Sequence, residues 1–409
     1  MADSRAHPPA DHSAETRRQL RTESVSAKFR SWVTAVCLGV LVCPALAADY
    51  APPRGAWATR AAVDAGFDAA RLSAAVELAK QKTVAEPQDL GPVILSHYAA
   101  REPGFRVLGP TGTRAGGSGL VLRGGYVVAQ WGDVERPEMV FSVAKSVLAT
   151  VAGVAVADGR IASIDDPVAR DVPEPLFTDD RNGAITWRHL LEQSSDWRGT
   201  LWEVPDWADR PTGATLRDWQ AQPRVAPGTV HEYNDVRVNL LALALLHVLR
   251  DPLPRVLRER IMDPIGASST WRWHGYDNSW VEIDGLRVQS VSGGGHYGGG
   301  LFISTADLAR FGLLIQRDGR WGGTTVVDPR WIRAMTEPSK PKSDYGLLWW
   351  LNSDRKAIPA APATAVWALG FGGNYVYVDR ENDLVVVLRW IPDGNGEAVI
   401  SAILEGLRD

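Results

Sequence analysis

Two residues near the start of a long apolar run, Ser142 and Lys145, carry the clearest chemical signal in the sequence. The run Phe141-Ser-Val-Ala-Lys-Ser-Val-Leu-Ala-Thr-Val-Ala-Gly-Val-Ala-Val-Ala157 is apolar nearly all round, which predicts a buried helix. Positions three apart share a helix face, so the serine hydroxyl and the lysine amine can meet. Burial favours a neutral amine that can accept a proton, and a helix N-terminus favours negative charge. The pair therefore predicts an activated serine nucleophile for acyl transfer.

The Ser-x-x-Lys spacing alone is a weak signal, because it occurs twice more in the chain. Ser339 and Lys342 lie in a proline-broken polar loop, and residues 353–356 form a solvated charged cluster with Ser353 and Lys356 at its ends. Neither has an apolar helix that would bury its lysine. For Ser142 the alternative is a helix-capping serine beside a lysine whose ammonium reaches solvent.

The composition excludes several classes of function. The chain has 409 residues, of which 45% are hydrophobic and 22% charged, so it can build a large globular core. A net charge of −4 gives no basic field for nucleic acid. The histidines are scattered, and neither His-Glu-x-x-His nor a Gly-x-Ser-x-Gly elbow is present, so we expect no metal, no other cofactor and no Ser-His-Asp triad.

The N-terminal segment resembles an export signal. Basic residues precede the apolar run 32–44, and Ala45-Leu-Ala47 follows it, which predicts a secretory signal peptide over residues 1–47. We therefore expect a periplasmic or secreted protein with no membrane segment beyond the signal, or alternatively an uncleaved N-terminal anchor. Cleavage would remove Cys37 and Cys43, the only cysteines, so the mature chain would have no disulfide.

Residues 48–409 are predicted to form one domain of the α/β (α+β) class. An amphipathic helix is expected at 67–80, a hairpin at 119–131, two strands at 374–379 and 384–390, and a closing helix at 397–407. This order predicts an antiparallel sheet built from both chain ends and flanked by helices, with sheet parts at about 48–160 and 290–409. Residues of about 161–289 would form a mainly helical insertion, with a cleft between the two parts.

Four further blocks follow Ser142 in an order that resembles the serine β-lactamase/penicillin-recognising superfamily. The nearest branches are the class C β-lactamases, the esterases related to them and the 6-aminohexanoate-dimer hydrolases. The blocks are Ile185-Thr-Trp-Arg-His-Leu-Leu191, Pro227-Gly-Thr-Val-His-Glu-Tyr-Asn-Asp235, Gly298-Gly-Gly-Leu-Phe-Ile-Ser-Thr-Ala-Asp-Leu-Ala-Arg-Phe311 and Leu369-Gly-Phe-Gly-Gly-Asn-Tyr-Val-Tyr-Val378. Their order over about residues 90 to 400 is far more specific than any one motif.

The resemblance implies a β-lactamase/transpeptidase-like fold and a role for each matching residue. Ser142 would be the nucleophile, Lys145 the general base, and Tyr233 a second proton carrier between the serine and the leaving group. The backbone N–H of Ser142 and one N–H of the strand near Phe371 would form an oxyanion hole, which stabilises charge that develops in the transition state.

Five residues are candidates for contact with the substrate beside the catalytic group: Asp235, Gly370, Phe371, Gly372 and His296. Gly370, Phe371 and Gly372 would let a substrate approach the backbone closely, although a bulge at a strand edge would also explain the glycines. His296, directly before the glycine block, could line the cleft or serve a structural role.

Two departures from the family pattern bear on the substrate. Asp235 stands where β-lactamases have an asparagine, and Ala368-Leu-Gly370 stands where they have Lys-Thr-Gly. The resemblance implies that the lysine would hold the carboxylate of a β-lactam. Its loss removes an attraction, and Asp235 is expected to add a repulsion. β-Lactams are therefore not expected as the main substrate, and an ester or a linear amide fits better.

Tryptophans are frequent, and several fall in the predicted insertion. They could line a broad apolar subsite or simply pack in the core. They are Trp187, Trp197, Trp202, Trp207, Trp219, Trp271, Trp273 and Trp280.

The sequence thus predicts an exported serine hydrolase that cleaves a small ester or linear amide through an acyl-enzyme, as a carboxylesterase or a 6-aminohexanoate-oligomer-type amidase. A D-specific peptidase or weak β-lactamase is the enzymatic alternative. A binding protein or sensor of slow turnover on the same fold is the alternative from another class.

Overall fold

The computed structural model describes residues 50–84, 88–172, 175–392 and 394–408. The chain divides into two units, Met1–Ala47 and Ala48–Asp409, and the described residues all lie in the second. The predicted signal peptide falls outside them and stays a prediction. Among the described residues, no helix is both long and apolar enough to span a membrane.

A six-stranded antiparallel sheet joins the two ends of the second unit, as predicted. Strand β3, from the N-terminal part, pairs with β16 from the C-terminal part, with Val386 opposite Val121. The order is β13 (Trp350–Leu351), β14 (Val366–Gly370), β15 (Asn374–Asp379), β16 (Leu384–Leu388), β3 (Gly119–Arg123) and β4 (Tyr126–Trp131).

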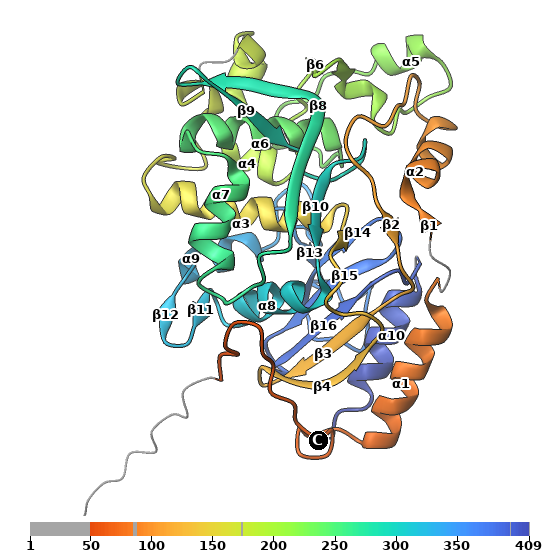
Figure 1. The fold of residues 1–409 in the computed structure, drawn as a ribbon. Coiled ribbons are helices and arrows are strands. Elements are labelled where there is room, and N and C mark those ends of the chain that lie inside the picture. Colours follow the sequence, from red (N-terminus) through yellow and green to blue (C-terminus); the bar gives the residue numbers. More distant parts are fainter. Residues whose placement is uncertain (1–49, 85–87, 173–174, 393, 409) are drawn as a thin grey trace, which may run out of the picture. The chain divides into compact units, whose positions relative to one another are not determined.

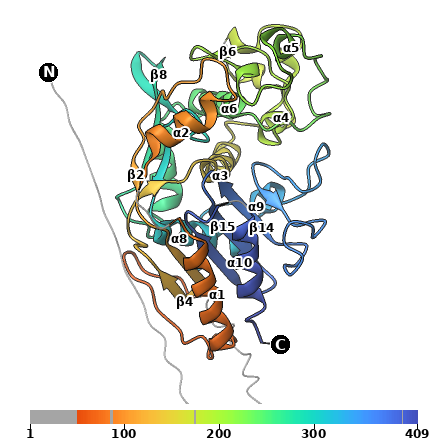
Figure 2. The same cartoon turned by 90° about the vertical axis from the view of Figure 1, so that its right-hand side faces the viewer.

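Helices cover both faces of this sheet. On one face α1 (Ala69–Lys82) lies beside α10 (Asn395–Leu404), as Figures 1 and 2 show. On the other face lie α8 (Thr305–Gln316), which packs on β15 and β16, and the N-terminal part of α3 (Val143–Ala157), which contacts β14. The sheet is thus buried on both sides, which is why every residue of β15 and β16 is buried.

Helices α3 and α6 (Asp235–Leu249) form the core of the part beyond the sheet. Residues Val143 to Ala155 of α3 are all buried, and α3 ends at Ala157, followed by the C-cap Asp158 and by Gly159 with φ of +68°. At the start of α6 the Asn234 side chain accepts a hydrogen bond from the Arg237 N–H, 3.0 Å away. Both helices are buried nearly all round, and they pack against each other rather than face solvent.

The predicted insertion, 161–289, contains more strand than expected. A long hairpin of β8 (Arg272–Ile283) and β9 (Leu286–Val291) belongs to a four-stranded sheet in the order β5 (Glu138–Met139), β10 (Gly300–Ile303), β8, β9. The other regular elements of the segment are mostly helical, as predicted, but this hairpin was not expected. Asp284-Gly285, both at positive φ, forms the hairpin turn, and an Asp-Gly pair between two β-rich runs is a recognisable signal for it.

The remaining elements are short. The α-helices are α2 (Leu90–Ala99), α4 (Trp187–Leu191), α5 (Leu216–Gln220), α7 (Leu253–Leu257) and α9 (Pro329–Met335). The 3₁₀-helices are η1 (Val168–Arg170), η2 (Pro175–Phe177), η3 (Asn182–Ala184) and η4 (Asp206–Ala208). A short π-helix, η5 (Arg258–Met262), follows α7. The two-stranded pairs are β1 (Gln88–Asp89) with β2 (Thr113–Arg114), β6 (Thr200–Leu201) with β7 (Val204–Pro205), and β11 (Arg320–Trp321) with β12 (Thr324–Thr325).

Candidate active site

Ser142 and Lys145 meet at the N-terminus of α3, as their spacing predicts. Lys145 Nζ donates a hydrogen bond to Ser142 Oγ over 2.7 Å. The serine side chain makes no capping hydrogen bond to the helix, and Lys145 is 1% exposed. These two facts exclude the alternative of a capping serine beside a lysine that reaches solvent. In the other two Ser-x-x-Lys spacings the serine hydroxyl donates to a backbone carbonyl oxygen instead, Ser339 to that of Lys342 and Ser353 to that of Ser343. Lys342 and Lys356 pair with Asp344 and Asp354 and make no hydrogen bond to the serine of their own spacing.

The residue before the serine has an unusual backbone. Phe141 has φ of +48°, in the left-handed region that side chains other than glycine rarely adopt. Its ring is buried against Phe371, 5.1 Å between centroids, and Trp390, 6.3 Å away. The packing compensates for the strained turn, and such strain concentrates at functional sites.

The serine opens onto a cleft of about 490 Å³. Its lining comes from α2, the start of α3, the loop after η4, the segment before α6, and β13 and β14 with the residue that follows. These residues are His97, Tyr98, Arg101, Glu102, Ser142, Arg210, Pro211, Tyr233, Trp350, Leu369, Gly370 and Phe371. The structure thus places Tyr233, Gly370 and Phe371 beside Ser142, as predicted from the order of the motifs.

Tyr233 contacts the lysine through its ring. Lys145 Nζ lies 4.8 Å from the ring centroid. The Tyr233 ring also stacks with the Trp350 ring, with 6.1 Å between the centroids and 22° between the planes. The phenol therefore stands at the cleft wall, within the same group of side chains as the serine and the lysine.

The end of β14 lies directly against the turn that holds Ser142. A Cβ added to Gly370 would come within 2.1 Å of the Val140 carbonyl oxygen and 3.2 Å of the Ser142 nitrogen. Within the described residues, neither the Ser142 nor the Phe371 backbone N–H donates a hydrogen bond. Two donors near each other can therefore serve a substrate oxygen, and Gly370 is required for this close approach.

Asp235, Gly372 and His296 do not line the cleft, which corrects their prediction as substrate-contacting residues. Asp235 is fully buried and accepts hydrogen bonds from Lys145 Nζ at 2.5 Å and Arg210 Nη1 at 3.0 Å. It therefore holds Lys145, and its charge is neutralised inside the protein rather than presented to a substrate in the cleft. Gly372, at φ of +78°, turns the chain between β14 and β15.

His296 belongs to a buried cluster behind Asp235. Its Nε2 donates to Glu102 over 2.7 Å, and its Nδ1 faces the Arg210 guanidinium at 3.4 Å. Burial lowers the pKa of His296 despite the neighbouring Glu102 carboxylate. Its role is structural, the alternative that the sequence left open.

The pKa values of the two aspartates in the cluster, Asp235 and Asp209, are shifted in opposite directions. Burial disfavours the ionised form of Asp235, but the charges of Lys145 and Arg210 outweigh it and hold the pKa below the ordinary value. Burial raises the pKa of Asp209 to about 6, with Asp235 adding to the shift and Arg210 opposing it. Asp209 accepts hydrogen bonds from Arg210 and from the Asp235 N–H.

Glu102, Asp209 and His296 also offer donor atoms that lie within 4.8 Å of one another, which is the spacing of a metal site. However, the donors already form hydrogen bonds within the cluster, and the Arg210 guanidinium contacts two of the three residues. A cation placed there would face that charge, so the donor set fits a hydrogen-bonded support better than a metal centre.

Six of the eight tryptophans of residues 161–289 fall into two groups, while Trp202 is half-buried and Trp280 is 44% exposed. Four are buried and pack in the core, which is the simpler of the two interpretations: Trp187, Trp197, Trp271 and Trp273. Trp207 and Trp219 stack 6.1 Å apart in a pocket that shares Arg210 and Pro211 with the cleft. Only these two adjoin the site.

Sequence reasoning missed Arg210, Glu102, Asp209 and Arg101. Glu102 and Arg101 follow α2, and Asp209 and Arg210 follow η4. None lies in a periodic segment or a motif block, so no local pattern marks them, and only the fold brings them to Ser142.

A model of the β-lactamase family matches residues 105–390. The chain is 26% identical over 296 residues to the 6-aminohexanoate-dimer hydrolase of Paenarthrobacter ureafaciens, with 66% of this chain and 70% of that protein covered. It is 24% identical over 270 residues to an Escherichia coli (strain K12) protein named "Putative D-alanyl-D-alanine carboxypeptidase", over 55% of this chain and only 62% of that protein's length. The crystal structure of a penicillin-binding protein homologue from Caulobacter crescentus shares the fold with a TM-score of 0.55 and 16% identity, covering 82% of this chain and 98% of that one.

The first prediction concerns the ion pair beneath the serine. Asp235→Ala leaves the Lys145 ammonium buried without its anion, and Arg210 loses one of its two carboxylates. Breaking a buried pair from one side costs about 3–5 kcal/mol, so we expect the free energy of unfolding in urea to fall by about that much. The control is Asp354→Ala, which removes an exposed ion pair with Lys356, so its free energy of unfolding should barely change. Equal free energies of unfolding for the two variants would contradict the role given to Asp235.

The second prediction follows from the raised pKa of Asp209. Between the unfolded pKa near 3.8 and the folded value of about 6, the folded protein keeps a proton that the unfolded chain releases. The stability from this carboxyl is therefore fully present below 3.8 and is lost as the pH rises through 6. Asp209→Asn removes this dependence, so its Tm relative to the unmodified protein should rise from pH 4.5 to pH 7.5. An offset in Tm that is the same at both pH values would refute the shift.

Proposed function

The chain belongs to the β-lactamase family, and we propose that this serine hydrolase is exported and cleaves an ester or a linear amide through a covalent acyl-enzyme. One observation carries the proposal: Ser142, Lys145 and Asp235 form a continuous chain of hydrogen bonds that ends at the cleft surface. Export rests on the signal-like segment of residues 1–47.

The geometry supports a two-step reaction. Ser142 Oγ loses its proton to Lys145 in its neutral amine form or to Tyr233 in its phenolate form, and bonds to the substrate carbonyl carbon, and the carbonyl oxygen takes the negative charge. The N–H groups of Ser142 and Phe371 are placed to stabilise that oxygen. The bond to the leaving group breaks as the leaving oxygen or nitrogen takes the proton. Water then attacks the acyl carbon, releases the acid and returns the proton to Ser142.

The preference for an ester or linear amide rests on β14 and not on Asp235. Ala368 is buried in the core, so this strand offers no cation at the position where the family's β-lactamases have a lysine. The matched Paenarthrobacter ureafaciens protein is named for hydrolysis of a linear amide dimer, which supports the same substrate class. The name of the Escherichia coli relative supports the alternative of a D-specific peptidase.

Covalent labelling tests the nucleophile. A fluorophosphonate probe should label the protein, and Ser142→Ala should abolish the labelling because no other described serine has a lysine within hydrogen-bonding distance at a cleft. Ser339→Ala, from another Ser-x-x-Lys spacing, is the control and should label normally. Absence of labelling in folded protein would refute the hydrolase and favour a binding protein.

A substrate panel tests the reaction class. Short-chain 4-nitrophenyl esters, linear 6-aminohexanoate dimer, a D-alanyl-D-alanine peptide and nitrocefin should be compared by kcat/KM under one set of conditions. We expect the ester or the linear dimer to exceed nitrocefin by about a hundredfold or more, since β14 has no cation for a carboxylate held along that strand, and loss of one charge contact costs about 2–3 kcal/mol. Nitrocefin or D-peptide turnover above both would refute the proposed substrate class.

A further inference from the structure

Arg210 presents part of its guanidinium to the cleft. Its Nη1 donates inward to Asp209 and to Asp235, and its Nη2 faces His296. The remaining N–H groups, on Nε and Nη2, have no partner among the described residues. The side chain is 37% exposed and lines both the cleft and the adjoining pocket. The Tyr233 ring centroid lies 5.0 Å from the guanidinium carbon, so the group is fixed by its inner contacts and partly open to the cleft.

The backbone of Arg210 is held in an unfavourable conformation. Its φ is +51°, which a residue with a long side chain rarely adopts. Two buried carboxylates hold the guanidinium in place, and its N–H donates to Glu102 over 3.3 Å. These contacts hold the charged group in place despite the strained backbone, and such strain concentrates at functional sites.

The other ionised side chains of the cleft add no free anion. Arg101 lines the same cleft, is exposed, and forms no ion pair within the described part of the chain. Glu102, the only carboxylate in the lining, is 4% exposed and bonded to His296. A ligand in the cleft therefore meets two guanidinium groups and no exposed carboxylate.

We propose that Arg210, with Arg101 beside it, binds a carboxylate of the substrate. The inference rests on the proposed function and deepens it: the hydrolysed ester or amide is anionic, with its carboxylate on the acyl or the leaving side a few bonds from the scissile carbonyl. A guanidinium suits this role because its planar N–H groups match both oxygens of a carboxylate. A chain of hydrogen bonds with only two residues between them, Asp235 and Lys145, connects Arg210 to Ser142. The two side chains are therefore close enough for one small substrate to contact both.

Matched ester pairs test the proposal and locate the charge. On the acyl side, 4-nitrophenyl hemiglutarate is compared with its neutral methyl ester, and on the leaving side 4-carboxyphenyl butyrate with 4-carbamoylphenyl butyrate. We expect kcat/KM to favour the carboxylate in at least one pair by about tenfold at low salt, as for a charge-assisted hydrogen bond. About 0.5 M NaCl should reduce this ratio.

The variants are judged by the same ratio, so that a general loss of activity cancels. Arg210→Gln should abolish the carboxylate preference, Arg210→Lys should retain part of it, and Arg101→Gln should reduce it with little effect on folding. Arg330→Gln, which removes an arginine with an 84% exposed side chain outside the cleft, is the control and should leave the ratio unchanged.

Two results would overturn the inference: equal or faster hydrolysis of the neutral ester in both pairs, or an unchanged ratio in Arg210→Gln and Arg101→Gln. Neither touches the proposed function if neutral esters are still cleaved in a Ser142-dependent way. Failure of every ester together with absent fluorophosphonate labelling would instead refute the proposed function itself.

Discussion

The site depends on the buried ion pair between Lys145 and Asp235. A lysine ammonium that is removed from water must have an anion and further hydrogen-bond acceptors, or the helix that carries it is destabilised. Asp235 supplies the anion from the first turn of α6, where the helix dipole favours negative charge, and Ser142 supplies another acceptor. The pair thus fixes the N-termini of α3 and α6 to each other and the serine to both.

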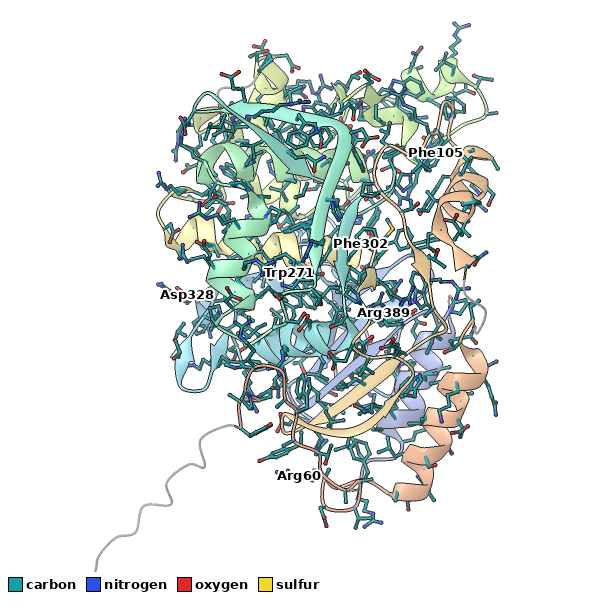
Figure 3. The ribbon with its side chains drawn as sticks, in the orientation of Figure 1. Arg60, Phe105, Trp271, Phe302, Asp328 and Arg389 are labelled. Carbon is teal, nitrogen blue, oxygen red and sulfur yellow. The ribbon has the colours of Figure 1, made fainter. Side chains whose placement is uncertain are left out.

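A second buried cation holds the opposite wall of the site. Arg389 is fully buried, donates to Asn374 Oδ1 at 2.6 Å and to the carbonyl oxygens of Met139 and Ile303. Asn374 in turn donates to the Phe371 carbonyl oxygen over 2.7 Å. Figure 3 shows Arg389 at the level where β10 approaches the six-stranded sheet. Burial lowers the pKa of Arg389 to about 10, so it remains charged at neutral pH and ties the Phe371 turn to both sheets.

The parts of this site that the sequence predicts are those encoded locally or in ordered motifs. The i, i+3 spacing of Ser142 and Lys145 is a property of one helix, and Tyr233 and Phe371 lie in recognisable blocks. The motif order also identifies the block that contains Asp235. The direction in which the Asp235 side chain points, however, depends on Lys145, 90 positions earlier in the chain. A sequence pattern shows that a carboxylate is present. Only the packing of α6 on α3 shows that it points inward and is neutralised.

The position of the positive charge shows how the cleft differs from the family pattern. On β14, Ala368 packs in the core that also holds α3, so a lysine there would have to lose apolar contacts and be desolvated. Arg210 lies on a loop instead, where buried carboxylates satisfy its inner donors and solvent reaches its outer ones. A cation held this way is already oriented before a ligand arrives. Binding an anion then requires no further ordering of the side chain, which favours recognition by a preformed site.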